Sequence, residues 1–128
     1  MDKLPGWTDI GHDALLSFRT SRPEPGVAVV AIRGEMDLAT APRMADELDT
    51  VHREAPRRLV LDMSGVAFLS STGIGALLNL HRECQCGDTD LALIPSSLVR
   101  RVLTVVGLAE VFTIIEPPSQ EADRRRLA

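Results

Sequence analysis

The stretch LVLDMSGVAFLSSTGIGALL, residues 59–78, decides the fold. It begins within a short apolar run, residues 58–63, that stops at Ser64 and Gly65, as is typical of a strand buried on both faces. Its second half repeats apolar residues at helical spacing, namely Ile74, Leu77 and Leu78, followed by His81. The hydroxyls of residues 70–72 supply the helix start. A buried strand that leads directly into a helix predicts an α/β protein with this strand at the centre of its sheet.

The residues before this stretch predict a hairpin and a helix. Residues 14–20 and the β-branched run 27–32 flank SRPEPG, whose Pro and Gly favour a turn between two strands. Residues 35–55 follow, with Thr40 as a plausible N-cap and Pro42 in the first helical turn. The apolar stripe of this helix consists of Met44, Leu48 and Val51.

The residues after it alternate in the same way. Residues 90–94 read as a buried strand, and Pro95 and Ser96 open a helix that Gly107 ends. We expect its core-facing stripe to be Leu98, Val102, Leu103 and Val106. Residues 111–115 predict a last strand. Alternating strands and helices imply a mostly parallel sheet with right-handed crossovers, and the opening hairpin makes the sheet mixed.

A chain of 128 residues fits one domain. We interpret residues 1–12 as a loose lead-in, 13–116 as the domain, and 117–128 as a tail or short helix. The net charge of -4 disfavours nucleic-acid binding. Cys84 and Cys86 offer no disulfide framework, and neither a signal peptide nor an apolar run of roughly 20 residues is present. We therefore expect a cytoplasmic protein without membrane insertion.

The segment from Ser64 to Thr72 is the candidate site, because ligands and switch chemistry in α/β sheets lie beyond the carboxyl ends of the strands. A phosphate on a hydroxyl at the helix start would lie near free backbone N–H groups and the positive end of the helix dipole. We expect Phe68 and Leu69 to anchor this loop in the core, and Gly73 and Gly75 to keep the approach to it uncluttered.

Two stretches carry a family resemblance: VVAIRGEMDLATAP (29–42) and the opening stretch resemble the signatures of STAS-domain anti-sigma factor antagonists. The resemblance covers roughly residues 13–116 and implies a single STAS-type domain. Residues 34–37 match the G-E-[LM]-D pattern, and 62–65 match D-[LM]-S-G. Residues 68–75 match F-[LM]-D-S-[ST]-G-[LI]-[GT] except at Ser70, where many members have Asp, and Ser71 corresponds to the phosphorylated serine.

The resemblance implies a bacterial partner-switching cycle in transcription regulation. The unphosphorylated chain binds an anti-sigma factor serine kinase, and a sigma factor is released. The kinase then phosphorylates Ser71 from ATP, binding is lost, and a phosphatase restores the chain. The ATP and Mg²⁺ belong to the kinase, so the chain itself needs no cofactor and is not an enzyme. The implied partner-binding residues are Asp37, Ser70, Ser71, Thr72, Gly73 and Ile74.

Each of these residues also has a structural interpretation. Ser71 could be a helix cap, and Ser70 and Thr72 compete with it as phosphate acceptors. Asp37 could serve a turn, and Asp-x-Ser-Gly at Asp62 makes a sound turn of its own. The string of His81, Cys84 and Cys86 has an unusual spacing for a metal site and lacks an evident fourth ligand.

Other functions remain as alternatives. A receiver-type phosphoprotein would need an acidic pair and a lysine on a later strand, whereas the chain has Lys3 alone. A non-switching STAS module would serve as a scaffold in a signalling assembly or a lipid-transport complex, and the departure at Ser70 favours it. An independent enzyme is the least supported alternative, because the sequence shows no nucleophile with a matched base.

Overall fold

The fold was analysed in a computed structural model that describes residues 7–12 and 16–116. The elements within these ranges are, in chain order, β1 (Trp7–His12), β2 (Leu16–Glu24), β3 (Val27–Met36), α1 (Ala41–His52), β4 (Arg58–Leu69), α2 (Ser71–Cys86), β5 (Asp90–Pro95), α3 (Ser97–Val105) and β6 (Thr113–Ile114). The predicted tail, residues 117–128, lies outside the described residues.

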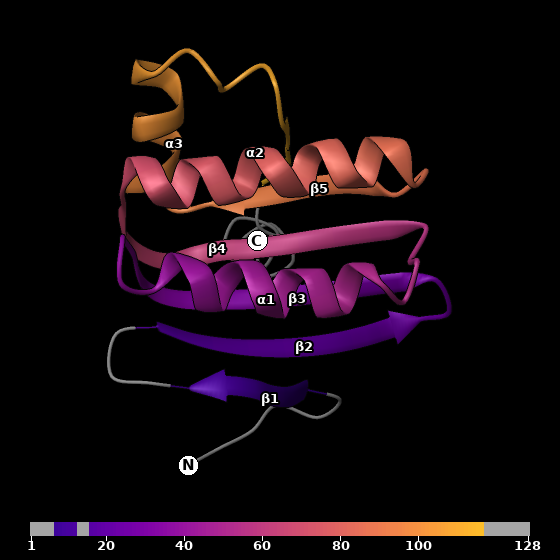
Figure 1. Ribbon diagram of the computed structural model, residues 1–128. Helices are drawn as coiled ribbons and strands as arrows, with labels where there is room; N and C mark the ends of the chain where they lie inside the picture. The colour runs from indigo at the N-terminus through magenta and orange to yellow at the C-terminus, as the bar shows by residue number, and fades with distance from the viewer. Residues whose placement is uncertain (1–6, 13–15, 117–128) are drawn as a thin grey trace, which may run out of the picture.

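The strands form one mixed sheet in the order β1-β2-β3-β4-β5-β6. The first three strands pair antiparallel, and β3 to β6 pair parallel. The predicted hairpin and the central place of β4 are therefore confirmed. In Figure 1, α1 and α2 lie side by side over one face of the sheet, and α3 lies at the end of the sheet where β4 leads into α2. The chain forms a single α/β domain of the predicted class.

One sequence prediction was wrong at the amino-terminal side. Residues 7–12, interpreted as part of a loose lead-in, form β1, which pairs antiparallel with β2 from Trp7 opposite Ser21 to His12 opposite Ser17. The pairing shifts register between Asp9 and Gly11. A strand with such an irregularity has weak periodicity in its sequence, and its conformation depends on the neighbouring strand.

A second prediction was wrong at the site itself. Residues 64–69, expected in a loop, continue β4 and pair with β3, with Gly34 opposite Val66 and Met36 opposite Leu69. The register shifts between Ala31 and Arg33, so the two strands are irregular in their second halves. β5 accompanies β4 only as far as Met63. The last part of β4 therefore projects past β5, paired with β3.

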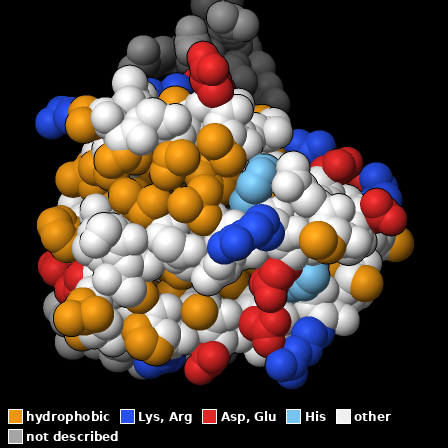
Figure 2. Space-filling model, turned by 45° about the horizontal axis from the view of Figure 1, so that its top comes forward, with side chains coloured by type: hydrophobic (Ala, Val, Ile, Leu, Met, Phe, Trp, Pro, Cys, Tyr) orange, Lys and Arg blue, Asp and Glu red, His pale blue; other side chains and the backbone are white. Residues whose placement is uncertain are grey.

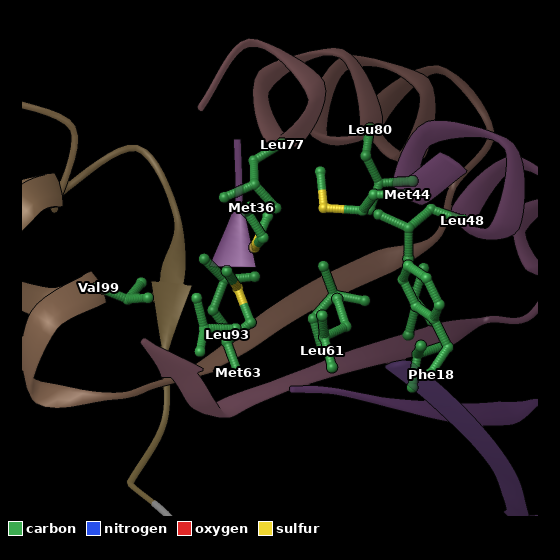
Figure 3. Packing of buried hydrophobic residues seen from close by; sticks show 14 of the residues in the cluster. Phe18, Met36, Met44, Leu48, Leu61, Met63, Leu77, Leu80, Leu93 and Val99 are labelled. Carbon is green, nitrogen blue, oxygen red and sulfur yellow. The ribbon is translucent and has the colours of Figure 1, made fainter. Parts of the chain in front are cut away.

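The core lies between the sheet and the helices. Leu61, Met63 and Leu93 point from the sheet toward Leu77 and Leu80 of α2, as Figure 3 shows. The stripe of α1, Met44, Leu48 and Val51, is buried as predicted. The apolar residues of the parallel strands β3, β4 and β5 thus meet those of α1 and α2 in one layer.

The predicted stripes of the other two helices were partly wrong. The buried residues of α2 are Gly73, Leu77, Leu80 and Cys84, while Ile74 and Leu78 are half-buried against the core. In α3 the buried residues are Val99 and Leu103, the predicted Leu98 and Val102 are half-buried against the core, and Val106 at the C-cap is exposed. Both helices are turned relative to the prediction, because the face that packs is set by the sheet and by neighbouring helices and not by apolar spacing alone.

The two glycines near the start of α2 occupy different surroundings. A Cβ on Gly73 would lie 2.9 Å from Leu69 Cδ1 and 3.1 Å from the Met36 carbonyl oxygen, whereas a Cβ on Gly75 would meet nothing within 4 Å. Gly73 therefore allows α2 to approach the ends of β3 and β4. The fold does not require Gly75.

Gly73→Ala should destabilise the fold by about 1–3 kcal/mol, because its methyl group must displace Leu69 or the backbone of β3. Gly75→Ala is the matched control and should raise the free energy of unfolding by about 0.5–1 kcal/mol, since alanine is the better helix former. Urea unfolding followed by circular dichroism measures both values. A Gly73→Ala protein as stable as the wild type would contradict this close packing.

Candidate functional site

The candidate site lies where the ends of β3 and β4 meet the start of α2. The backbone N–H of Ser70 donates to the Met36 carbonyl at 2.8 Å, so the chain leaving β3 and the chain leaving β4 are joined directly. Asp37 follows Met36 in the sequence, and Ser71 follows Ser70. Two segments that are more than 30 positions apart in sequence thus form one surface at the carboxyl ends of the strands.

The hydroxyls of residues 70–72 are not equivalent. Ser70 is the N-cap of α2, and its Oγ accepts from the backbone N–H of Gly73 at 3.3 Å. Its carbonyl accepts from the Ile74 N–H at 2.9 Å, and its side chain is only partly exposed. Ser71 and Thr72 are the first residues inside the helix and are both exposed. The cap therefore occupies the Ser70 oxygen and leaves the Ser71 and Thr72 side chains at the surface.

Asp37 orders the neighbouring loop. Its Oδ1 accepts from the backbone N–H groups of Ala39 at 2.9 Å and Thr40 at 3.0 Å. The Thr40 hydroxyl donates to the Glu35 carbonyl at 2.7 Å and accepts from the Asp37 N–H at 2.9 Å. Thr40 stands at the N-cap position of α1 as predicted, but its side chain makes no cap hydrogen bond to that helix. Asp37 and Thr40 together fix the loop between β3 and α1.

The remaining predicted contact residues differ in exposure. Gly73 is buried, and Ile74 is half-buried against the core, one helical turn from Ser71. Asp62 lies farther back in β4, where its Oδ1 accepts from the Ser64 N–H at 3.0 Å and from the Ser64 hydroxyl at 2.6 Å. These local bonds agree with a structural role for Asp62, but the expected turn is absent, because residues 62–65 lie within β4.

Two apolar side chains at the site are exposed, which the sequence did not predict. Phe68, expected to anchor a loop in the core, is 46% exposed, whereas its neighbour Leu69 is buried. Leu38, in the loop that Asp37 orders, is 76% exposed. The alternation of a strand explains the first result, because adjacent residues of β4 point to opposite faces. Reading residues 64–69 as a strand would have predicted it.

The string of His81, Cys84 and Cys86 is spread over different surroundings. The His81 ring packs edge-on against Phe112, with ring centres 5.3 Å apart. Cys84 is buried, and this burial raises the pKa of its thiol to about 11, while Cys86 is exposed. Within residues 7–12 and 16–116, no group of three or more His, Cys, Asp or Glu side chains is placed to hold a metal ion. Among the described helices, none has the length and apolarity of a membrane span.

Ser70→Ala should lower the free energy of unfolding by about 1 kcal/mol, because it removes the side-chain cap of α2. Ser71→Ala is the control and should change that free energy by less than about 0.5 kcal/mol, since its side chain is exposed. Urea denaturation measures both variants. An equal loss of unfolding free energy in Ser70→Ala and Ser71→Ala would mean that the Ser70 side chain does not cap α2.

Comparisons with known proteins identify the family of this chain. The family model described as "STAS domain" matches residues 20–122. The anti-sigma-F factor antagonist RsfB of Mycobacterium tuberculosis is 33% identical over 89 residues, which cover 70% of this chain and 73% of RsfB. The crystal structure of an anti-sigma factor antagonist from Mycobacterium paratuberculosis superimposes with a TM-score of 0.71 at 25% identity, over 87% of this chain and 92% of that one.

More distant relatives share the same fold. The Bacillus cell fate determinant SpoIIAA, solved in its phosphorylated form, has a TM-score of 0.63 at 19% identity, over 87% of this chain and 99% of SpoIIAA. The family match covers more than half of the chain, and the 33% identity to RsfB extends over 70% of it. The chain therefore belongs to the STAS-domain family of anti-sigma factor antagonists.

Proposed function

We propose that this chain is a partner-switching antagonist whose phosphoacceptor is Ser71. In its unphosphorylated form it binds an anti-sigma factor serine kinase, and a sigma factor is released. The kinase transfers the γ-phosphoryl group of ATP to Ser71 Oγ, which leaves ADP and ends the binding. A phosphatase hydrolyses the phosphoserine and restores the active form.

The different surroundings of the adjacent hydroxyls carry this proposal. A kinase must bring the acceptor oxygen in line with the γ-phosphate, so the acceptor must be exposed and free to leave its local contacts. Ser71 is exposed, whereas the Ser70 oxygen accepts the cap bond of α2. Thr72 is exposed as well, and the resemblance of Ser71 to the family's phosphorylated serine favours Ser71 over Thr72.

The remaining contact residues of the proposed interface surround Ser71. They are Asp37, Ser70, Thr72, Gly73 and Ile74. Asp37 contributes by fixing the loop beside the acceptor, and Gly73 by letting α2 lie close to the strand ends. Ile74 offers a partly exposed apolar side chain on the same helical face as Ser71.

Phosphorylation at the start of α2 acts on docking and leaves the fold in place. A phosphoserine adds about -1.5 to -2 charges and three acceptor oxygens. The first N–H groups of a helix and its dipole stabilise such a group, so the helix remains. The shared fold of phosphorylated SpoIIAA is in keeping with this. A surface that must lie flush against a partner, however, loses its complementarity when it carries a dianion.

In the proposed cycle, the kinase and the phosphatase carry out all catalysis. The kinase supplies ATP and Mg²⁺, and the phosphatase supplies the hydrolytic step, so this chain is a substrate and a binding partner and not an enzyme. Because a sigma factor acts on transcription, we assign the cycle to the cytoplasm.

A second candidate is a non-switching STAS module that acts as a scaffold in a signalling assembly or a lipid-transport complex. The observation in its favour is the hydroxyl of Ser70 at the cap, where many family members have a carboxylate. In that case binding to a kinase-like partner would not respond to a charge at Ser71.

The chain should be incubated with ATP and, in turn, each anti-sigma kinase encoded in the same genome. The partner kinase should add one phosphate to it, because Ser71 is exposed at the start of α2. Intact-mass and peptide mass spectrometry should map it to Ser71, and Ser71→Ala should abolish it. A phosphate on Thr72 or Ser70 would keep the function and correct the site. No phosphate with any of these kinases would favour the non-switching module.

Ser71→Ala should bind the kinase as tightly as the wild type and stay bound in the presence of ATP. Ser71→Asp should bind at least about tenfold more weakly, since a charge then lies in the contact. Isothermal titration calorimetry with purified kinase measures both affinities, and thermal melts check that both variants fold. Equal affinity of the two variants would eliminate the proposed switch.

A further inference from the structure

We propose that the groove between α1 and α2 receives a basic segment of the phosphatase that removes the phosphate from Ser71. This inference rests on the proposed function and names the surface on which the phosphatase docks. The two helices lie side by side over one face of the sheet, as Figure 1 shows, with a groove of about 590 Å³ between them. The residues that line the groove come from both helices, so they share one surface.

The walls of the groove are formed by one stripe of each helix. The lining residues of α2 are 72, 75, 76, 79, 80 and 83, which repeat at helical spacing and therefore lie on one face of the helix. The lining residues of α1 lie between Ala41 and Asp49. Leu48 and Leu80 are buried and close the groove toward the core, whereas Ala45 and Ala76 are small and leave it open above.

Gly75 widens the groove without serving the fold. It lines the groove, and a Cβ on it would meet nothing within 4 Å. Glycine inside a helix costs stability relative to alanine, so packing within this chain does not account for the residue. A partner that approaches α2 closely at this point accounts for it, because a side chain there would project into the space that the partner fills.

The groove begins beside the proposed acceptor. Thr72 lines it and follows Ser71 directly, and Gly75 lies one helical turn from Ser71 on the same face of α2. From Thr72 to Glu83 the lining residues span about 16 Å of helix. A protein that acts on Ser71 can therefore occupy this groove while its active site holds the acceptor.

Carboxylates lie on both walls. Of the described residues that line the groove, the charged ones are Asp46 and Asp49 on α1 and Glu83 on α2. Arg53 pairs with Asp49 at 2.8 Å, whereas no ion pair within the described ranges includes Asp46 or Glu83. These two exposed carboxylates favour a segment that carries Lys or Arg, and they repel an acidic one.

The sign of this charge selects the phosphatase over the kinase. A phosphate on Ser71 adds about -1.5 to -2 charges at the end of a groove that is already acidic. A basic segment in the groove is then attracted more strongly, which suits the partner that must bind the phosphorylated chain. The kinase must instead leave when this charge appears. Hydrolysis adds water across the Oγ–P bond and yields inorganic phosphate and the serine hydroxyl, so the attraction falls and the phosphatase dissociates.

The neighbouring surface has a different character. Figure 2 shows hydrophobic side chains gathered over α2 and α3, and Val105 at the end of α3 is 78% exposed. Neither Val105 nor the exposed carboxylate Glu110 lines the groove. These two residues therefore provide control positions outside the proposed docking surface.

The test measures dephosphorylation of the full chain, phosphorylated by its kinase, by the purified phosphatase of the same cell. Asp46→Lys and Glu83→Lys should each raise the KM for phosphate release at least about fivefold and leave kcat within about twofold. Glu110→Lys makes the same change in net charge, and both it and Val105→Ser should change the KM less than about twofold. Gly75→Ala should raise the KM at least about threefold, although thermal melts show a fold at least as stable as the wild type.

Phosphorylation of the same variants separates the two partners. Asp46→Lys and Glu83→Lys should leave the KM of the kinase for the chain within about twofold of the wild type. An unchanged phosphatase KM in both lysine variants, or an equal rise in Glu110→Lys, would overturn the inference while the proposed function stands. A higher KM for the kinase alone would assign the groove to the kinase and likewise overturn the inference. A chain that no kinase of its own cell phosphorylates would overturn both.

Discussion

The hydrogen bond from the Ser70 N–H to the Met36 carbonyl is the constraint on which the site depends. It closes the β3–β4 pairing at its last residue and determines where β4 stops and α2 begins. Gly73 must then pass close to the same Met36 carbonyl, and the absence of a side chain there permits it. The position of the first turn of α2 follows from these contacts.

The same constraint holds the groups around Ser71 in fixed positions. The cap of α2 holds Ser70, the Asp37 turn holds the preceding loop, and strand pairing holds Phe68. Ser71 lies among these fixed groups with its own side chain exposed. A charge added there changes the surface while the backbone beneath it stays in place. In the proposed cycle, the response to phosphorylation is therefore a change in complementarity toward the partner.

Neighbouring residues at the ends of β3 and β4 differ in burial. Leu69 and Met36 turn toward α2 and are buried, so they stabilise the fold. Phe68, adjacent to Leu69, and Leu38, two residues past Met36, remain exposed and make little contribution to the core. Alternation along β4 thus places Leu69 in the core and Phe68 at the surface, whereas Leu38 is exposed because it lies in the loop after β3.

The sequence by itself determined the α/β class, the hairpin, the central strand and a helix that starts at the hydroxyls of residues 70–72, because apolar periodicity and cap chemistry act locally. Together with the family resemblance, it also singled out Ser71 as the proposed phosphoacceptor. Only the tertiary structure decided that residues 7–12 pair as a strand, that β4 runs on to Leu69 and that Phe68 faces outward. Strand extension depends on hydrogen bonds to a neighbouring strand that local periodicity does not encode. The distinction between Ser70 and Ser71 has the same origin, since it required knowing which backbone N–H groups lie beside each hydroxyl.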